Sequence, residues 1–191
     1  VTIDQERLHI EMTSNKNIKT STPPLGTIVE HFENILSKGY DKIIHFIISS
    51  KLSSMYELFS LTSKNYLDDK IVIIDSLGLS LGMFSQVMYT YLSIQNNVNL
   101  DEILVELDKR QSDTQLFCAP ENLTALKKGG RISPAIAALG NTIGVKPLLS
   151  LKDGALEKEA MIRNVKKSFY DKINISVRGS LFMGSNDGKT A

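Results

Sequence analysis

Two short apolar runs constrain the fold of this chain more than any other feature of its sequence. They span residues 43–48 and 71–74, and isoleucine fills most of their positions. A short continuous apolar run is typical of a strand that is buried on both faces, as the strands of parallel sheets are. Both runs are far shorter than the roughly 20 apolar residues that a membrane span needs. We therefore expect two interior strands of a parallel sheet and no stable membrane insertion.

Helical patterns separate these runs. Apolar residues recur at helical spacing in two segments, and helix-start signals stand before two more. In order, these are the spacing over residues 28–36, the Ser54–Glu57 capping box, the spacing over about 79–94, and the Asn99–Glu102 capping box. Residues 115–119 predict a third strand. This alternation predicts an α/β fold, with a mainly parallel sheet flanked by helices.

The pattern changes near residue 120. The elements expected beyond it are a helix over residues 121–128 ended by Gly129-Gly130, a helix opened by Ser133-Pro134, and a hairpin over residues 146–162 closed by Asp153-Gly154. We therefore expect an α/β domain over residues 1–120, whose first 19 residues form a loop. A smaller α+β domain, expected to be incomplete, follows over residues 121–191.

Charge and cysteine content exclude several classes of function. The formal net charge is +1, so bulk electrostatics gives no reason to expect a nucleic-acid partner. Cys118 is the single cysteine, which excludes an internal disulfide framework and leaves a zinc cluster unsupported. We expect Cys118 to be a buried, inert thiol and the protein to be cytoplasmic.

Short hydroxyl side chains gather where a ligand of an α/β sheet is expected. Ligands of such sheets bind beyond the carboxyl ends of the strands. Residues 49–54, which include Ser53 and Ser54, follow the first strand and open a helix, and Thr20 and Ser21 precede two prolines. Hydroxyls beside the free amides of a helix start suit a carboxylate or a phosphate. Simple capping of the helix by these serines is the alternative interpretation.

The string LKKGGRIS, residues 126–133, is the most distinctive local motif. Its glycines allow a sharp turn, and Arg131 follows on a constrained loop where its guanidinium fits an oxyanion. The alternative is a helix end with solvated cations, among them Lys128.

Templates for catalysis or metal binding are poorly supported. No phosphate-binding P-loop and no dinucleotide-binding glycine motif is present in the sequence. The three histidines, of which His45 lies within the first apolar run, do not have the spacing of metal ligands. Asp75 ends the second run, where a catalytic role and a turn role both fit. We therefore assign no catalytic residue and no metal site.

Taken together, the motifs resemble the DegV family. They are KTSTP (19–23), ISSKLSSMY (48–56), VIIDS (72–76), LKKGGRIS (126–133), KPL (146–148) and LKDG (151–154), in this order. The resemblance covers about residues 15–165. It implies a two-domain fold whose larger α/β domain buries a long-chain fatty acid, with no cofactor besides that lipid. It also implies a binding subunit of bacterial fatty acid kinase, a non-enzyme carrier whose kinase partner converts the bound acid to an acyl phosphate.

The resemblance also implies the site residues. Thr20 and Ser53 match the positions that bind the carboxylate, and Arg131 matches the arginine near the lipid head. Ser21 and Ser54 are further candidates for contact with the head group or the partner. Ser54-Met55 stands where the family has Gly-Thr, so we expect altered head-group geometry. The chain is expected to lack the N-terminal strand and the C-terminal histidine-containing segment of the family.

An apolar tunnel is part of this hypothesis. The candidate wall residues are Leu52, Phe59, Leu81, Phe84, Met88 and Leu123, each of which also fits an ordinary core. One alternative is an α/β enzyme that binds a small molecule or phosphate at the same strand ends, with Arg131 and Lys128 as anion clamps. The other is an interaction module that docks a protein through residues 127–131.

Overall fold

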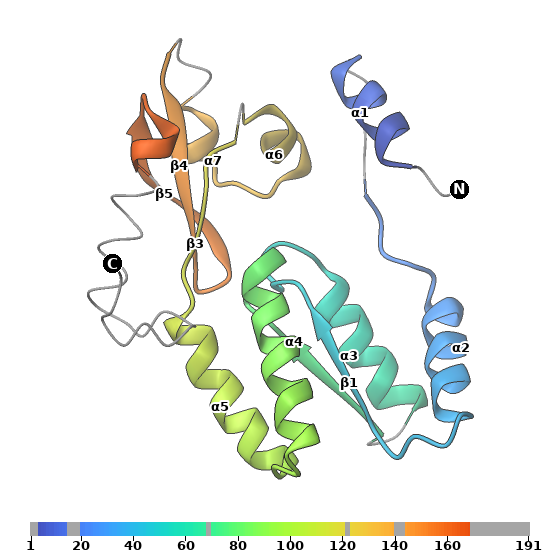
Figure 1. The fold of residues 1–191 in the computed structure, drawn as a ribbon. Helices are drawn as coiled ribbons and strands as arrows, with labels where there is room; N and C mark the ends of the chain where they lie inside the picture. Colours follow the sequence, from blue (N-terminus) through green and yellow to red (C-terminus); the bar gives the residue numbers. More distant parts are fainter. Residues whose placement is uncertain (1–3, 15–19, 68–69, 121–122, 140–143, 169–191) are drawn as a thin grey trace, which may run out of the picture.

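The computed structural model describes residues 4–14, 20–67, 70–120, 123–139 and 144–168 (Figure 1). The helices and strands in these ranges are α1 (Gln5–Thr13), α2 (Leu25–Leu36), β1 (Ile43–Ile47), α3 (Met55–Tyr66), β2 (Ile71–Asp75), α4 (Ser80–Gln95), α5 (Leu100–Asp113), β3 (Leu116–Cys118), α6 (Thr124–Gly129), α7 (Pro134–Ala137), β4 (Lys146–Lys152) and β5 (Ala155–Ile162). Among the described helices, none has the length and apolar character that crossing a membrane requires.

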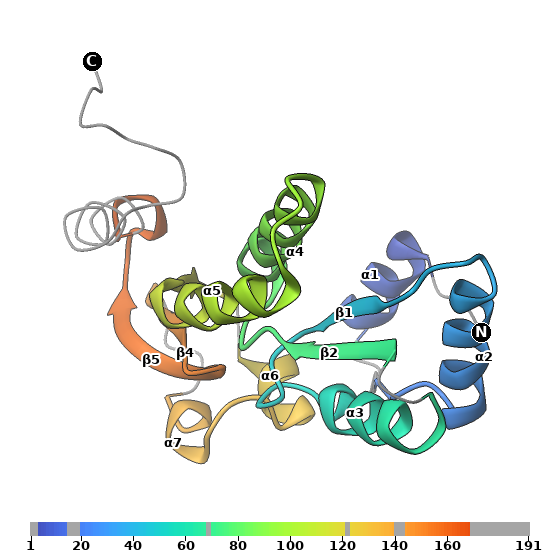
Figure 2. The ribbon, with the colours of Figure 1, turned by 90° about the horizontal axis from the view of Figure 1, so that it is seen from below.

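β1 and β2 form a parallel pair, as the two apolar runs predicted, but among the described residues these two strands make up the whole parallel sheet. Neither is therefore an interior strand, and most of their residues are half-buried. Ile43 lies opposite Ile71, and Ile47 lies opposite Asp75. Because side chains alternate along a strand, Ile43 and Ile47 join the core under α2 and α3. Figure 2 shows α2 and α3 on one side of this sheet and α4 and α5 on the other. The chain is thus an α/β fold with helices on both faces of a parallel sheet.

Aromatic rings fix α2 and α3 against β1. The Phe32 ring of α2 is fully buried and meets the rings of His45 and Phe59 edge-on, at centroid distances of 5.2 and 5.8 Å. His45 of β1 stacks on Phe59 of α3 at 4.8 Å. Besides burying apolar area, these ring contacts fix the orientation of α2 and α3 against β1.

The predicted third strand exists but belongs to a different sheet. β3 pairs antiparallel with β4, with Leu116 opposite Leu151, and β4 pairs antiparallel with β5. Its placement in the parallel sheet was therefore wrong. The change of sheet falls between α5 and β3. The division into domains at residue 120 stays a prediction, and residues 169–191 lie outside the described residues.

The hairpin of β4 and β5 confirms the Asp-Gly turn. Lys152 lies opposite Ala155, so Asp153 and Gly154 form a two-residue loop. Their φ angles are 46° and 79°, the left-handed values that a tight turn between twisted strands requires. The turn fixes the tip of the hairpin in the second sheet, which consists of β3, β4 and β5.

The N-terminal segment differs from the expected loop. Residues 5–13 form α1, and the Asp4 carboxylate accepts a hydrogen bond from the Arg7 amide at 2.7 Å. Asp4 therefore caps a helix whose apolar spacing is too weak to signal it. Residues 15–19 of the expected loop lie outside the described residues.

Two predicted helix starts are confirmed, and one is made differently. Asn99 accepts from the Asp101 amide at 2.8 Å, and Ser133 accepts from the Ile136 amide at 3.3 Å. Ser54 precedes α3 but makes no side-chain capping bond. Its neighbour Ser53 accepts from the Met55 amide at 3.3 Å instead, so the predicted capping box was wrong.

Candidate functional site

Two loops meet beyond the carboxyl ends of the parallel strands. The serine loop, residues 49–54, joins β1 to α3, and the β2–α4 loop covers residues 76–79. The Ser49 amide donates to the Gly78 carbonyl at 2.9 Å, and the Ser76 amide donates to the Ile47 carbonyl at 3.0 Å. The predicted ligand edge is therefore a pair of loops that are hydrogen-bonded to each other.

The Asp75 carboxylate holds both loops. Its Oδ1 accepts from the Ser50 amide at 3.1 Å and from the Leu77 amide at 3.0 Å. Of the two roles that the sequence left open, the structure gives Asp75 the turn role. This aspartate links the loops through their backbones.

Two glutamines donate hydrogen bonds to the end of β2 and the start of the β2–α4 loop. The Gln86 side chain of α4, 1% exposed, donates to the Ser76 carbonyl at 2.9 Å. Gln111 of α5 donates to the Asp75 carbonyl at 2.8 Å. The sequence did not identify either residue, because glutamine on a helix normally faces solvent.

The predicted carboxylate ligands lie in different surroundings. Ser53 is half-buried within the serine loop, and Ser54 beside it is exposed. Thr20 and Ser21 are exposed in the segment before α2. Among the described residues, no hydrogen bond joins Thr20 or Ser21 to the serine loop. The carboxylate-binding roles of Thr20 and Ser53 stay predictions.

Arg131 does reach the serine loop. Its Nε donates to the Leu52 carbonyl at 3.1 Å, and its Nη1 donates to the Gly129 carbonyl. The guanidinium thus binds a carbonyl at the end of α6 and a carbonyl of the serine loop, the latter 79 positions away in the sequence. Lys128, the second clamp of the enzyme alternative, is exposed on α6.

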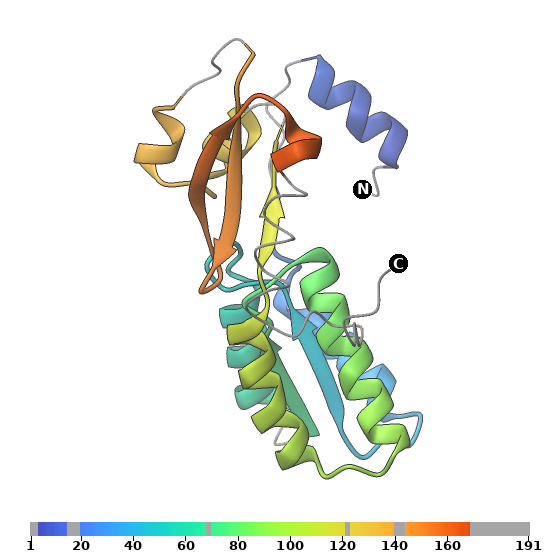
Figure 3. The same cartoon turned by 60° about the vertical axis from the view of Figure 1, so that its left-hand side comes forward.

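The hairpin tip contacts the same loop from a second direction. Ser49 is fully buried, and its Oγ donates to the Gly154 carbonyl at 2.6 Å. Figure 3 shows the turn between β4 and β5 directed at the carboxyl end of β1. Three parts of the fold therefore converge on residues 49–54: the parallel sheet, the loop after α6 and the hairpin.

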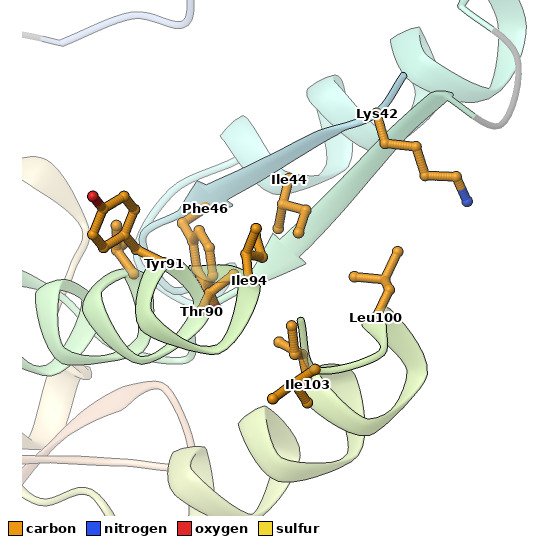
Figure 4. Close-up of a pocket in the computed structure, with 10 residues that line it drawn as sticks. Lys42, Ile44, Phe46, Thr90, Tyr91, Ile94, Leu100 and Ile103 are labelled. Atoms are coloured by element: carbon orange, nitrogen blue, oxygen red, sulfur yellow. The ribbon is translucent and has the colours of Figure 1, made fainter. Parts of the chain in front are cut away.

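An apolar pocket of about 470 Å³ lies between β1 and the helices α4 and α5 (Figure 4). Ile44 and Phe46 of β1 form one side of it, and Ile94 of α4 forms part of the other. The remaining lining residues are Lys42, Val87, Thr90, Tyr91, Val98, Leu100 and Ile103. The lining is mostly apolar, and its one charged residue, Lys42, immediately precedes β1.

The six tunnel candidates do not line one cavity, so this prediction was wrong for the described residues. Phe59 is buried in the core under α2 and α3, and Leu123 is buried in the core of the second sheet. Leu52 is half-buried in the serine loop. The other three lie on α4, where Leu81 is 73% exposed, Phe84 56% and Met88 37%. Apart from Ser80 and Gln95 at its two ends, the exposed side chains of α4 are apolar or aromatic, and the helix has no charged residue.

The other titratable candidates have structural surroundings. Burial, and secondarily the charge of His31, lowers the pKa of His45. Cys118 is half-buried, not buried as expected, and it packs against the core of the second sheet. Its burial raises the pKa of the thiol, and its inertness stays a prediction. Over the described ranges, no three metal-ligating side chains come together.

Comparison with known proteins gives consistent matches. The sequence profile described as "Uncharacterised protein, DegV family" matches residues 1–184. A DegV domain-containing protein of Mycoplasmopsis pulmonis (strain UAB CTIP) is 36% identical over 159 residues, which are 82% of this chain and 54% of that protein. A DegV domain-containing protein of Staphylococcus aureus (strain COL) is 32% identical over 78% of this chain and 52% of its own length. The chain spans about half the length of these curated relatives.

Solved structures share the fold. A fatty-acid-binding DegV family protein from Thermus thermophilus superimposes with a TM-score of 0.81 and 25% identity, over 93% of this chain and 64% of that one. The fatty acid kinase B3 protein of Streptococcus pneumoniae, loaded with linoleic acid, gives a TM-score of 0.77 at 22% identity, over 91% of this chain and 62% of that one. The second likeness, at this identity, concerns the fold alone.

Proposed function

Because the chain belongs to the DegV family, we propose that it binds a long-chain fatty acid, with the carboxylate at the serine loop and the acyl chain along α4. The fatty-acid binding of the Thermus thermophilus relative supports the ligand class. The proposal needs no cofactor besides the lipid. It assigns the carboxylate to the hydroxyls of Thr20 and Ser53, with Ser21, Ser54 and Arg131 nearby in sequence or space.

The observation that carries the proposal is the junction of a polar edge with an apolar helix. The serine loop is hydrogen-bonded to the β2–α4 loop, and that loop leads directly into α4. The Ser53 Oγ accepts a hydrogen bond from the Met55 amide. Among the described residues, no acceptor receives the proton of the Ser53 hydroxyl. A serine hydroxyl that accepts one bond still donates one, so this proton fits a carboxylate oxygen.

The acyl chain supplies most of the binding free energy in this proposal. Each buried methylene contributes about 0.8 kcal/mol, so a long chain buried on all sides contributes on the order of 10 kcal/mol before ordering costs, and a chain that only lies on α4 contributes less. The exposed Leu81, Phe84 and Met88 offer apolar area for it along α4, starting at the strand ends. The carboxylate contributes less and sets the direction in which the lipid lies.

Mass spectrometry of lipids extracted from the purified protein tests the ligand class. A copurified long-chain acid is expected, whereas a phosphorylated metabolite would favour the enzyme alternative. Titration with a fatty acid then tests the site. Ser53→Ala should weaken affinity by about 1–3 kcal/mol, since it removes a donor from a desolvated oxyanion.

Ser37→Ala is the matched control for this titration. Ser37 is exposed after α2, and its hydroxyl donates only to the Asn34 carbonyl at 2.8 Å. This variant should keep the affinity of the unmodified protein. Equal affinities of the Ser53→Ala and Ser37→Ala variants would refute the carboxylate assignment.

We further propose that the bound acid is presented to a kinase partner. In that reaction a carboxylate oxygen attacks the γ-phosphorus of ATP, and the bond to the β-phosphate oxygen breaks to release ADP. The carrier performs no phosphoryl chemistry itself. Incubation with a fatty acid kinase catalytic subunit and ATP should yield an acyl phosphate that hydroxylamine traps as a hydroxamate. No hydroxamate from lipid-loaded protein would overturn this step.

A further inference from the structure

We propose that the second sheet and the loop after α6 set the shape of the serine loop, with Gly154 and Arg131 as positioning residues. The inference rests on the proposed function, because it concerns the loop that carries Ser53. It assigns Arg131 to the Leu52 backbone rather than to the lipid head.

Ser49 is the residue through which the loop is held. Its carbonyl accepts from the amides of Leu52 at 2.9 Å and Ser53 at 3.1 Å. Its Oγ accepts from the Lys51 amide at 3.1 Å while donating to the Gly154 carbonyl. A displacement of Ser49 therefore moves the backbone that places Ser53.

Gly154 packs so closely against Ser49 that only glycine fits at this position. A Cβ at this position would overlap the Ser49 Oγ and lie 3.1 Å from Leu77 Cδ2. The φ of 79° also disfavours any side chain. The hairpin tip thus fits against both strand-end loops with no room for a methyl group.

Arg131 holds the opposite end of the same loop. Its Nε binds the Leu52 carbonyl, and its Nη1 binds the Gly129 carbonyl of its own turn. Because the guanidinium group is planar and rigid, the bond from Nη1 to Gly129 also fixes the position of Nε. The serine loop is therefore fixed at residue 49 by the hairpin and at residue 52 by the turn after α6.

Hydrogen exchange in the ligand-free protein tests this positioning role without requiring lipid. The reporters are the Leu52 and Ser53 amides, which are bonded inside the loop. Gly154→Ala should speed their exchange by about tenfold or more, the effect of losing a buried hydrogen bond. Gly39→Ala is the matched control, since Gly39 has a φ of 89° and nothing within 4 Å of its Cβ position.

Arg131→Ala tests the second attachment and also covers the case in which Gly154→Ala fails to fold. It should speed exchange of the same two amides by about tenfold. Arg131→Lys, which keeps the charge but loses the planar group, should not restore their protection. Lys128→Ala removes a nearby exposed charge and should leave exchange unchanged.

The outcomes separate this inference from the proposed function. Faster loop exchange in the Gly154 and Arg131 variants supports the positioning role, whether or not lipid binds. Unchanged exchange in both variants overturns it, even if Ser53→Ala abolishes lipid binding. Restored protection in Arg131→Lys would show that charge alone acts, and would also overturn it.

Discussion

At the scale of single residues, His45 connects the packing of the sheet to pH. Its ring stacks on Phe59 and lies near His31, and burial is the main cause of its lowered pKa. A folded-state pKa below the unfolded value of 6.5 means that the unfolded state binds the proton first as the pH falls. The free energy of unfolding should therefore decrease below about pH 6.5.

Urea unfolding at pH 7.5 and pH 5.5 measures this dependence. His45→Phe keeps an aromatic ring in contact with Phe32 and Phe59 and removes the titrating group. The drop in stability between the two pH values should be smaller in this variant than in the unmodified protein. His31→Gln should show an intermediate drop, because His31 is the lesser cause of the shift. Identical drops in all three proteins would contradict this account.

Thr90 provides a second prediction at this scale. The residue is 4% exposed, and its buried Oγ1 has no hydrogen-bond partner among the described residues. A buried hydroxyl without a partner is unfavourable, and valine has the same shape. Thr90→Val should raise the free energy of unfolding by about 1 kcal/mol in urea titration. Destabilisation by this isosteric change would mean that the hydroxyl has a partner in solution.

At the scale of the element, α5 illustrates the effect of one cap. The Asn99 side chain accepts from the Asp101 amide, and α5 in turn carries Gln111, which donates to the Asp75 carbonyl at the end of β2. Asn99→Ala should cost about 1 kcal/mol of stability, measured by chemical unfolding. Asn99→Asp, another strong cap, should restore most of it. A similar loss in both variants would show that the amide group, and not capping, matters.

The elements also show what sequence patterns can predict. The parallel strands and the Asp153-Gly154 turn were predictable, because a strand covered by helices and a positive φ each demand particular residue types. The partner of β3 was not, since residues 115–119 have the same strand pattern in either sheet. The pairing of β3 is decided by its contacts with residues 149–151 of β4, which lie far along the chain. The helix α1 was missed because its only clear signal is the Asp4 cap.

The site was predictable to a smaller extent. The serines at the strand end and the GGR string indicated where loops converge, since both follow from local chain chemistry. The contact between Arg131 and the Leu52 carbonyl could not be predicted, because backbone carbonyls are present at every residue. The hydrogen bonds of Gln86 and Gln111 to the Ser76 and Asp75 carbonyls could not be predicted either, because only the tertiary fold brings these helical side chains there.

At the scale of the whole molecule, ligand binding should couple to stability. The chain has two cores, one under the parallel sheet and one beside the antiparallel sheet, and the serine loop touches elements of both. A ligand that binds only the folded protein stabilises it by about 2.7 kcal/mol at 100 times its dissociation constant. A saturating fatty acid should therefore raise the melting temperature.

Calorimetric or dye-free optical melting measures this shift. Ser53→Ala should reduce it, and Ser37→Ala should not. A charge on the apolar helix, as in Phe84→Asp, should reduce it as well, because Phe84 is exposed on α4 and offers acyl contact in the proposal. A full shift in the Phe84→Asp variant would place the acyl chain elsewhere.

The bond between Ser49 and Gly154 spans 105 positions of the chain. During translation, at about 5–20 residues per second, the acceptor leaves the ribosome some 5–20 seconds after the donor. The parallel strands can pair in that interval, but a nascent chain cannot close the loop that they support. In the proposed arrangement, the loop that carries Ser53 is therefore complete only after the hairpin has been synthesised.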